Sequence, residues 1–159
     1  MTIDFTNIES AVISMDAFLL KWRFTDSKYY ELPKEHLNQL KPLSFEGAKF
    51  LNDHIGQLHN EVPFTANFFR VVDQIDISDE SEAKKWLYGR GLPFEKSVFL
   101  VWDEETAMIA PWKLVVKYSN EFYYAVSDDL TVFDQDLSWA ILFFHTDQIY
   151  FGTNHDFTI

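Results

Sequence analysis

Imidazole, carboxylate and phenol side chains gather toward the C-terminal end of the chain, where two kinds of chemistry are open to them. His145 and Asp147 are two residues apart near the end of an expected strand, so both side chains could point the same way. Asp128 and Asp129 could approach them from a neighbouring turn. A metal or general-base site at these residues would support a metal-assisted hydrolase that uses His145, Asp147 and Asp128. The same side chains could instead cap turns locally, or contact a partner.

The second possibility is a docking surface for a cationic protein. From Tyr118 to Ile159, 42 residues contain no Lys or Arg, but they include seven acids and eleven aromatic side chains. Negative charge speeds encounter with a basic partner, and aromatic side chains supply contact energy. The alternative is that the aromatic residues form the core and the acids keep the domain soluble. The docking interpretation predicts that five Asp and three Tyr residues bind the partner: Asp128, Asp129, Asp134, Asp136, Asp147, Tyr123, Tyr124 and Tyr150.

Composition excludes several other functions. The 159 residues include 13 Lys and Arg against 25 Asp and Glu, for a formal charge of −12, and there is no Cys. The missing thiols exclude disulfide scaffolds, thiolate zinc sites and cysteine nucleophiles. The net charge disfavours nucleic acid and anionic membranes as partners, because both require Lys and Arg. Zinc-helix, phosphate-loop and nucleophile-elbow motifs are all missing, so we expect no catalytic residue, no bound metal and no cofactor.

The organisation of the chain predicts one domain over 1–159 in the cytoplasm. No stretch has the composition of a linker, and no internal repeat is present. Acids interrupt the N-terminal segment, which therefore does not read as a secretion signal, and no apolar run has the length of a membrane span.

The elements that position these residues divide into helices first and strands later. Apolar side chains at Ile8, Val12, Met15, Leu19 and Trp22 recur at helical spacing and predict a first helix. A short helix is expected over 34–40. A third begins at a Ser44 cap and buries five residues: Phe45, Ala48, Leu51, Ile55 and Leu58. A fourth begins at an Asp79 cap and ends near residue 89.

The later half reads mainly as strands. We expect strands over 97–102 and 106–110, a helix from Pro111 to about Tyr123, and three further strands over 130–133, 138–145 and 149–152. Short polar turns join those last three strands, which predicts an antiparallel meander. The fold class is therefore α+β, with N-terminal helices packed on a mostly antiparallel C-terminal sheet and covering one of its faces.

Several segments resemble known proteins. They are Tyr88-Gly89-Arg90-Gly91-Leu92-Pro93-Phe94, Val98-Phe99-Leu100-Val101-Trp102, Pro111-Trp112-Lys113, Ser127-Asp128-Asp129, Trp139 and Ile149-Tyr150-Phe151-Gly152. Together they resemble a family of small uncharacterised acidic bacterial proteins over most of 32–152. More loosely, Leu32-Pro33 before a short helix and the strands from Trp139 to Gly152 resemble the SUKH-type immunity proteins of bacterial toxin systems. That resemblance implies an acidic α+β domain that neutralises a toxin in the cytoplasm and has no catalytic residues.

These observations favour a non-enzymatic acidic protein of a toxin–antitoxin pair, namely an immunity protein that binds a basic, nuclease-like toxin. A nuclease site is cationic because it holds phosphates, so an inhibitor can present carboxylates in their place. The metal-assisted hydrolase remains an alternative. A ligand-binding or interaction module is a further one, and a deep aromatic pocket around Trp112 and Trp139 would favour it.

Overall fold

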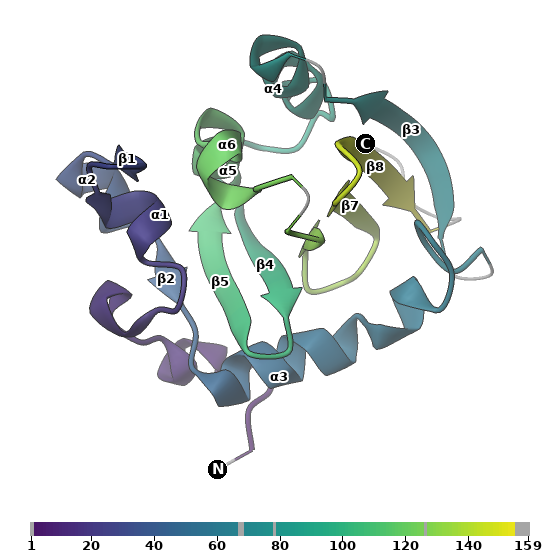
Figure 1. The fold of residues 1–159 in the computed structure, drawn as a ribbon. Helices are drawn as coiled ribbons and strands as arrows, with labels where there is room; N and C mark the ends of the chain where they lie inside the picture. The colour runs from purple at the N-terminus through teal and green to yellow at the C-terminus, as the bar shows by residue number, and fades with distance from the viewer. Residues whose placement is uncertain (1, 67–68, 78, 126, 155–159) are drawn as a thin grey trace.

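The computed structural model describes residues 2–66, 69–77, 79–125 and 127–154, and its centre is an antiparallel sheet (Figure 1). Among these residues, seven strands form the sheet in the order β2-β5-β4-β6-β7-β8-β3, and every neighbouring pair runs antiparallel. The strands are β2 Lys41–Pro42, β3 Arg70–Asp76, β4 Ser97–Asp103, β5 Thr106–Pro111, β6 Leu130–Phe133, β7 Trp139–Phe144 and β8 Gln148–Thr153. The α+β class is confirmed, and β6, β7 and β8 form the predicted meander.

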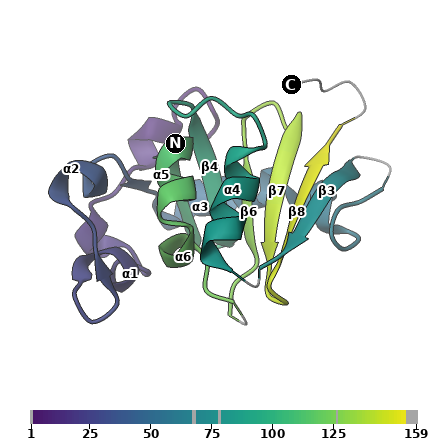
Figure 2. The ribbon, with the colours of Figure 1, turned by 90° about the horizontal axis from the view of Figure 1, so that it is seen from above.

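Helices cover both faces of the sheet, whereas we expected them to cover one. Figure 2 shows α4 (Glu80–Tyr88) and α5 (Trp112–Lys117) in front of the sheet and α3 (Phe45–His54) behind it. Two separate apolar clusters result, one on each face. The cause is the composition of the central strands: every residue of β6 is buried, and all of β7 except the last, so neither face can be left to water.

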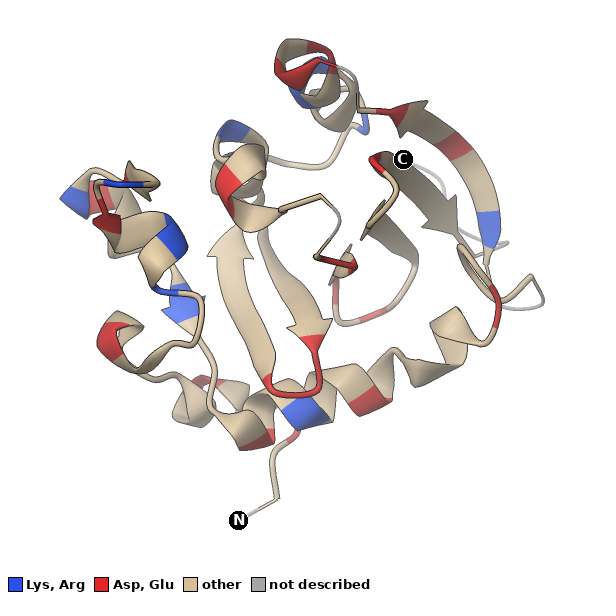
Figure 3. Ribbon diagram, in the orientation of Figure 1, with Lys and Arg blue, Asp and Glu red and all other residues tan. Residues whose placement is uncertain are grey.

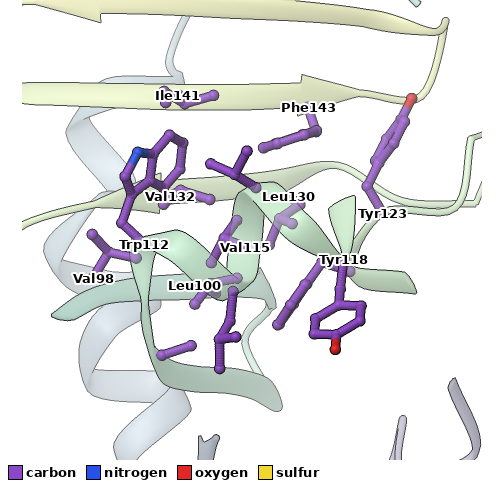
Figure 4. Packing of buried hydrophobic residues seen from close by; sticks show 14 of the residues in the cluster. Val98, Leu100, Trp112, Val115, Tyr118, Tyr123, Leu130, Val132, Ile141 and Phe143 are labelled. Carbon is purple, nitrogen blue, oxygen red and sulfur yellow. The ribbon is translucent and has the colours of Figure 1, made fainter. Parts of the chain in front are cut away.

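The larger cluster lies between the sheet and the helices α4 and α5. In Figure 4, Trp112 and Val115 of α5 point toward Val132 of β6 and Ile141 of β7. Trp112 and Trp139 are fully buried, and their ring centroids are 6.4 Å apart. These two side chains are therefore core residues, and the aromatic pocket that would have favoured a ligand-binding module is not formed around them.

The capped helices begin where the sequence predicts. The Ser44 hydroxyl accepts a hydrogen bond from the Gly47 backbone N–H, and the Asp79 carboxylate accepts one from the Ser81 N–H at 2.8 Å. Four of the five expected core residues of α3 and the turn after it are buried. Phe45 is the exception, at 59 % exposed, because it lies in the first turn on the solvent side.

The predicted first helix is wrong. Its residues form two 3₁₀ turns, η1 (Ile8–Ala11) and η2 (Met15–Ala17), and a single turn of α-helix, α1 (Trp22–Thr25). Between the 3₁₀ turns the Ile13 N–H donates to the Pro42 carbonyl oxygen, and Val12 forms a β-bridge with Leu43. At Val12 and Ile13 the backbone therefore pairs with the segment of β2 and does not continue a helix, as suits β-branched side chains.

The remaining helical segments are short. α2 (Lys34–Leu37) lies inside the predicted 34–40 helix, and η3 (Gly56–His59) follows α3. The helix expected from Pro111 is divided into α5 and α6 (Ser119–Phe122), because Tyr118 leaves helical geometry with φ −112°. β1 (Tyr30–Glu31) lies outside the main sheet. Within the described residues, no helix combines the length and apolar character needed to cross a bilayer.

Candidate functional site at the acidic end of the sheet

One end of the sheet carries a concentration of exposed carboxylates. Val101 of β4 pairs with Thr131 of β6, and Leu130 of β6 pairs with Phe143 of β7, so the end of β4, the start of β6 and the β7–β8 turn lie at the same end. Asp76 of β3 pairs with Gln148 of β8, which brings the end of β3 there too. Exposed acids at this end, named here the acidic end, are Asp76, Asp103, Glu104, Glu105, Asp129 and Asp147.

No cation in these segments offsets the carboxylates. The described segments 74–77, 102–106, 127–130 and 144–148 contain no Lys or Arg. Strands are about 4.8 Å apart, so the acidic end extends roughly 20 Å from β4 to β3. Figure 3 shows the acidic β4–β5 turn beside α3, where Lys49 is paired with Asp53 at 2.9 Å. The net charge of the acidic end is therefore negative, although Lys49 also interacts electrostatically with Glu104.

The structure divides the five aspartates predicted for partner binding. Asp129 and Asp147 are exposed at the acidic end. Asp128 lies at the same end but is only 8 % exposed, and its carboxylate forms two bonds with the Arg23 guanidinium, at 2.6 and 3.1 Å. Asp134 and Asp136 follow β6 and so lie at the opposite end of the strand, where Asp134 is buried and 3.7 Å from Lys96. The five residues are therefore not one contiguous surface.

The three predicted tyrosine anchors are less exposed than a docking surface needs. Tyr123 is buried, its hydroxyl donates to the Phe144 carbonyl oxygen, and burial raises its pKa to about 12. Tyr124 is half-buried, and its ring lies 4.1 Å from the Arg23 guanidinium carbon. The Tyr150 hydroxyl donates to Gln148 Oε1 at 2.6 Å. Tyr123 is thus a core residue, and the other two offer only part of each ring.

A pocket opens on the α3 side of the acidic end. Its volume is about 250 Å³. Apolar side chains make most of its wall: Ile55, Val62, Pro63, Val101, Leu142 and Phe144. The other lining residues are Asn52, His59, Trp102, Asp129 and Thr131. The pocket combines an apolar wall with a few polar groups, as binding sites commonly do.

Hydrogen bonds settle the tautomer of His59, an exposed residue that lines this pocket. Its Nδ1 lies 3.3 Å from the Pro63 carbonyl oxygen, which can only accept, so Nδ1 carries the proton. Nε2 then accepts from the Thr131 hydroxyl at 2.9 Å. The Thr131 oxygen keeps its acceptor capacity, as does the Asp129 carboxylate at the rim. Thr131 and Asp129 therefore offer acceptors to a ligand, while the Asn52 amide can donate or accept.

The sequence-based reasoning missed His59 and Thr131, which are 72 residues apart and match no motif. The two residues meet because η3 lies near β6 in the folded protein, and no local sequence pattern shows that contact. Thr131 and Asp129 are two residues apart around the start of a strand, so they share a face. That spacing is the one signal in the sequence that connects two of the pocket residues.

Acid is expected to destabilise the protein through His59. Burial lowers the pKa of His59 below its ordinary value of 6.5, so below that pH the unfolded state binds more protons than the folded state. The free energy of unfolding should therefore fall as the pH drops through and below 6.5. Urea unfolding of the wild type and of His59→Gln at a series of pH values measures this effect. The variant should show a flatter dependence, and equal slopes would contradict the assignment.

The residues of the predicted metal site are only partly brought together. His145 Nδ1 lies 2.9 Å from Asp129 Oδ1, which also accepts from the His145 N–H. Asp128, in contrast, is directed inward to Arg23. Among residues 2–66, 69–77, 79–125 and 127–154, no three His, Asp or Glu side chains are placed to share a metal ion. The geometry supports a His145–Asp129 pair at the rim of the pocket, not the predicted trio of ligands.

Comparison with protein-family models, with curated proteins and with solved structures finds no match to this chain. The resemblance to immunity proteins therefore rests on the sequence segments quoted above.

Proposed function

We propose that the chain is a non-enzymatic immunity protein that binds a basic, nuclease-like toxin at the acidic end of its sheet. The observation that carries the proposal is the gathering of six exposed acids from four segments, with no Lys or Arg in those segments. Three of the acids are consecutive at the β4–β5 turn: Asp103 is the last residue of β4, and Glu104 and Glu105 follow it. A nuclease site holds phosphates with cations, so the carboxylates of the acidic end could occupy the positions of the phosphates.

We expect electrostatic attraction to speed the approach of the partner to the acidic end. Charge complementarity mainly raises the association rate. The acidic end is about two Debye lengths long at 0.1 M ionic strength, so added salt screens its attraction for a partner. Salt should therefore slow association strongly. Apolar contact must come from residues beside the acids, and the pocket next to Asp129 supplies such a surface.

The proposal can be tested with a basic toxin-type domain, taken from a neighbouring gene where one encodes it. Co-expression with this chain should rescue growth of cells that produce the domain, and the two proteins should co-purify. The association rate should fall at least about tenfold between about 50 and 500 mM NaCl. Failure to rescue, or an association rate that does not respond to salt, would overturn the proposal.

Neutralising acids at the acidic end should slow association more than neutralising acids elsewhere. In the variant Glu105→Gln/Asp147→Asn two exposed charges are removed, and Asn still tolerates the left-handed backbone of residue 147 (φ 64°). The matched control is Glu95→Gln/Asp136→Asn, which removes two exposed charges at the opposite end of the sheet. Stopped-flow measurements should show an association rate about tenfold lower for the first variant and nearly unchanged for the control. Equal slowing would point to net charge alone.

A further inference from the structure

We propose that the pocket beside Asp129 is the receptor for a lysine or arginine side chain, with apolar walls for the aliphatic stem and acceptors for the charged head. This inference rests on the proposed function, since it names the group of the basic partner that enters the site. The residues that line the pocket come from α3 and the segment after it, from the end of β4, from the start of β6 and the turn before it, and from β7. Its volume of about 250 Å³ suits one extended side chain better than a large cofactor.

The wall of the pocket matches the stem of a basic side chain. Leu142 and Phe144 of β7 line it, together with Ile55, Val62 and Pro63 from the end of α3 and the segment after it. Lys and Arg carry three or four methylene groups that bury well against apolar surface while the charge stays near water. Val62 is 67 % exposed, so it extends the apolar wall out of the pocket, where a partner would cover it.

The polar groups of the pocket favour a donor-rich, positively charged head. Asp129 Oδ1 accepts both bonds from His145, and no donor among the described residues contacts Oδ2. The Thr131 hydroxyl donates to His59 Nε2, which leaves its oxygen as an acceptor. Trp102 also lines the pocket, and its N–H is occupied by the Phe122 carbonyl oxygen at 2.8 Å. An aromatic ring, a carboxylate oxygen and a hydroxyl oxygen are all complementary to an ammonium or guanidinium group.

The surrounding charge selects against other ligands. The turn at 103–105 and Asp147 place four further carboxylates at the same end of the sheet. These carboxylates would repel an anionic ligand, and a neutral apolar ligand would leave the Asp129 carboxylate without a new partner. A cation with an aliphatic stem satisfies both the wall and the rim, so we commit to that occupant.

Small side-chain mimics test the pocket without the partner protein. The probes are n-butylammonium and n-butylguanidinium chloride, with 1-pentanol as the neutral control of similar length, and binding is followed by NMR at the Trp102 indole and the His59 ring. We expect both cations to shift these signals and to bind at least about tenfold more tightly than pentanol. Asp129→Asn, which keeps the acceptor for His145, should weaken cation binding about tenfold, while Glu95→Gln should not. Equal binding of pentanol, or no effect of Asp129→Asn, would overturn the proposal.

Kinetics with the toxin-type partner separate this inference from the proposed function. Removing a contact inside a pocket mainly raises the dissociation rate, whereas removing the surrounding acids mainly lowers the association rate. Asp129→Asn should therefore raise the dissociation rate about tenfold, beyond its effect on association. If Glu105→Gln/Asp147→Asn slows association but Asp129→Asn leaves dissociation unchanged, the proposed function stands and the pocket inference fails. If the cationic probes bind but the partner does not, the pocket binds cations and the proposed function fails.

Discussion

Replacing Arg23 with Met is expected to lower the free energy of unfolding by about 3–5 kcal/mol. The guanidinium of Arg23 and the carboxylate of Asp128 form a two-bond pair in which both side chains are buried. The Tyr124 backbone N–H also donates to Asp128 Oδ2 at 2.7 Å, and the Tyr124 ring contacts the guanidinium. Met has a similar apolar stem but no charge, so the variant would leave the Asp128 carboxylate buried without its cation.

Urea denaturation of Arg23→Met measures this loss directly. The matched control is Lys49→Met, because Lys49 and Asp53 form an exposed pair whose removal should change stability much less. The double variant Arg23→Met/Asp128→Leu should recover part of the loss, since it no longer buries an unpaired charge. A loss for Arg23→Met no larger than that for Lys49→Met would contradict the buried-pair interpretation.

The Arg23–Asp128 pair also changes how binding experiments should be designed. It connects α1 to the turn that precedes β6, across 105 residues of sequence. Substitution of Asp128 would disturb the position of that turn, and with it the exposed Asp129. Binding defects in an Asp128 variant would therefore reflect folding as much as charge, so Asp129 and Asp147 are the appropriate positions to change.

Replacing Gly152 with Ala is expected to destabilise the protein by about 1–3 kcal/mol through overpacking. A Cβ atom at Gly152 would lie 2.7 and 2.8 Å from two ring carbons of Phe64, and 3.3 Å from the Arg70 carbonyl oxygen. Phe64 is buried and stacks against His59, with ring centroids 5.9 Å apart. We expect a shift of the Phe64 ring away from β8 to disturb Val62 and Pro63, which precede it and line the pocket.

Gly56→Ala is the control for this substitution. Nothing lies within 4 Å of a Cβ atom at Gly56, so Ala there should be neutral or slightly stabilising. Thermal unfolding compares the two variants, and NMR at His59 reports whether the pocket segment shifts in Gly152→Ala. Adding Phe64→Leu to Gly152→Ala should recover part of the stability because the smaller side chain vacates the contact. Equal unfolding temperatures for the two alanine variants would show that the Phe64 segment adjusts freely.

Local sequence signals predicted the elements whose boundaries are marked by a helix cap or a polar turn. Ser44 and Asp79 are side-chain caps, and the helices α3 and α4 begin directly after them. The strands β4 to β8 were predicted within two residues, because polar turns separate runs of apolar side chains. The prediction of the first helix was wrong because its apolar spacing is helical, but Val12 and Ile13 pair with the segment of β2. No local sequence pattern indicates that pairing.

The candidate site depended much more on pairing between distant segments. The basic-free C-terminal segment suggested an acidic surface, and two of its aspartates, Asp129 and Asp147, do lie at the acidic end. Asp134 and Asp136 lie at the other end because the chain has crossed the sheet along β6 before reaching them. The turn at 103–105 belongs to the acidic end although it precedes that segment, since β4 runs antiparallel to β6.

The sequence by itself determined the class of the fold, the positions of most strands and the sign of the surface charge. Each of these follows from composition, spacing or a cap, and such features act over a few residues. Only the tertiary structure decided which carboxylates share a surface, that Asp128 is neutralised inside the protein, and that His59 meets Thr131 in a pocket. Strand register and burial set these relations, and both depend on contacts between residues that are far apart in the chain.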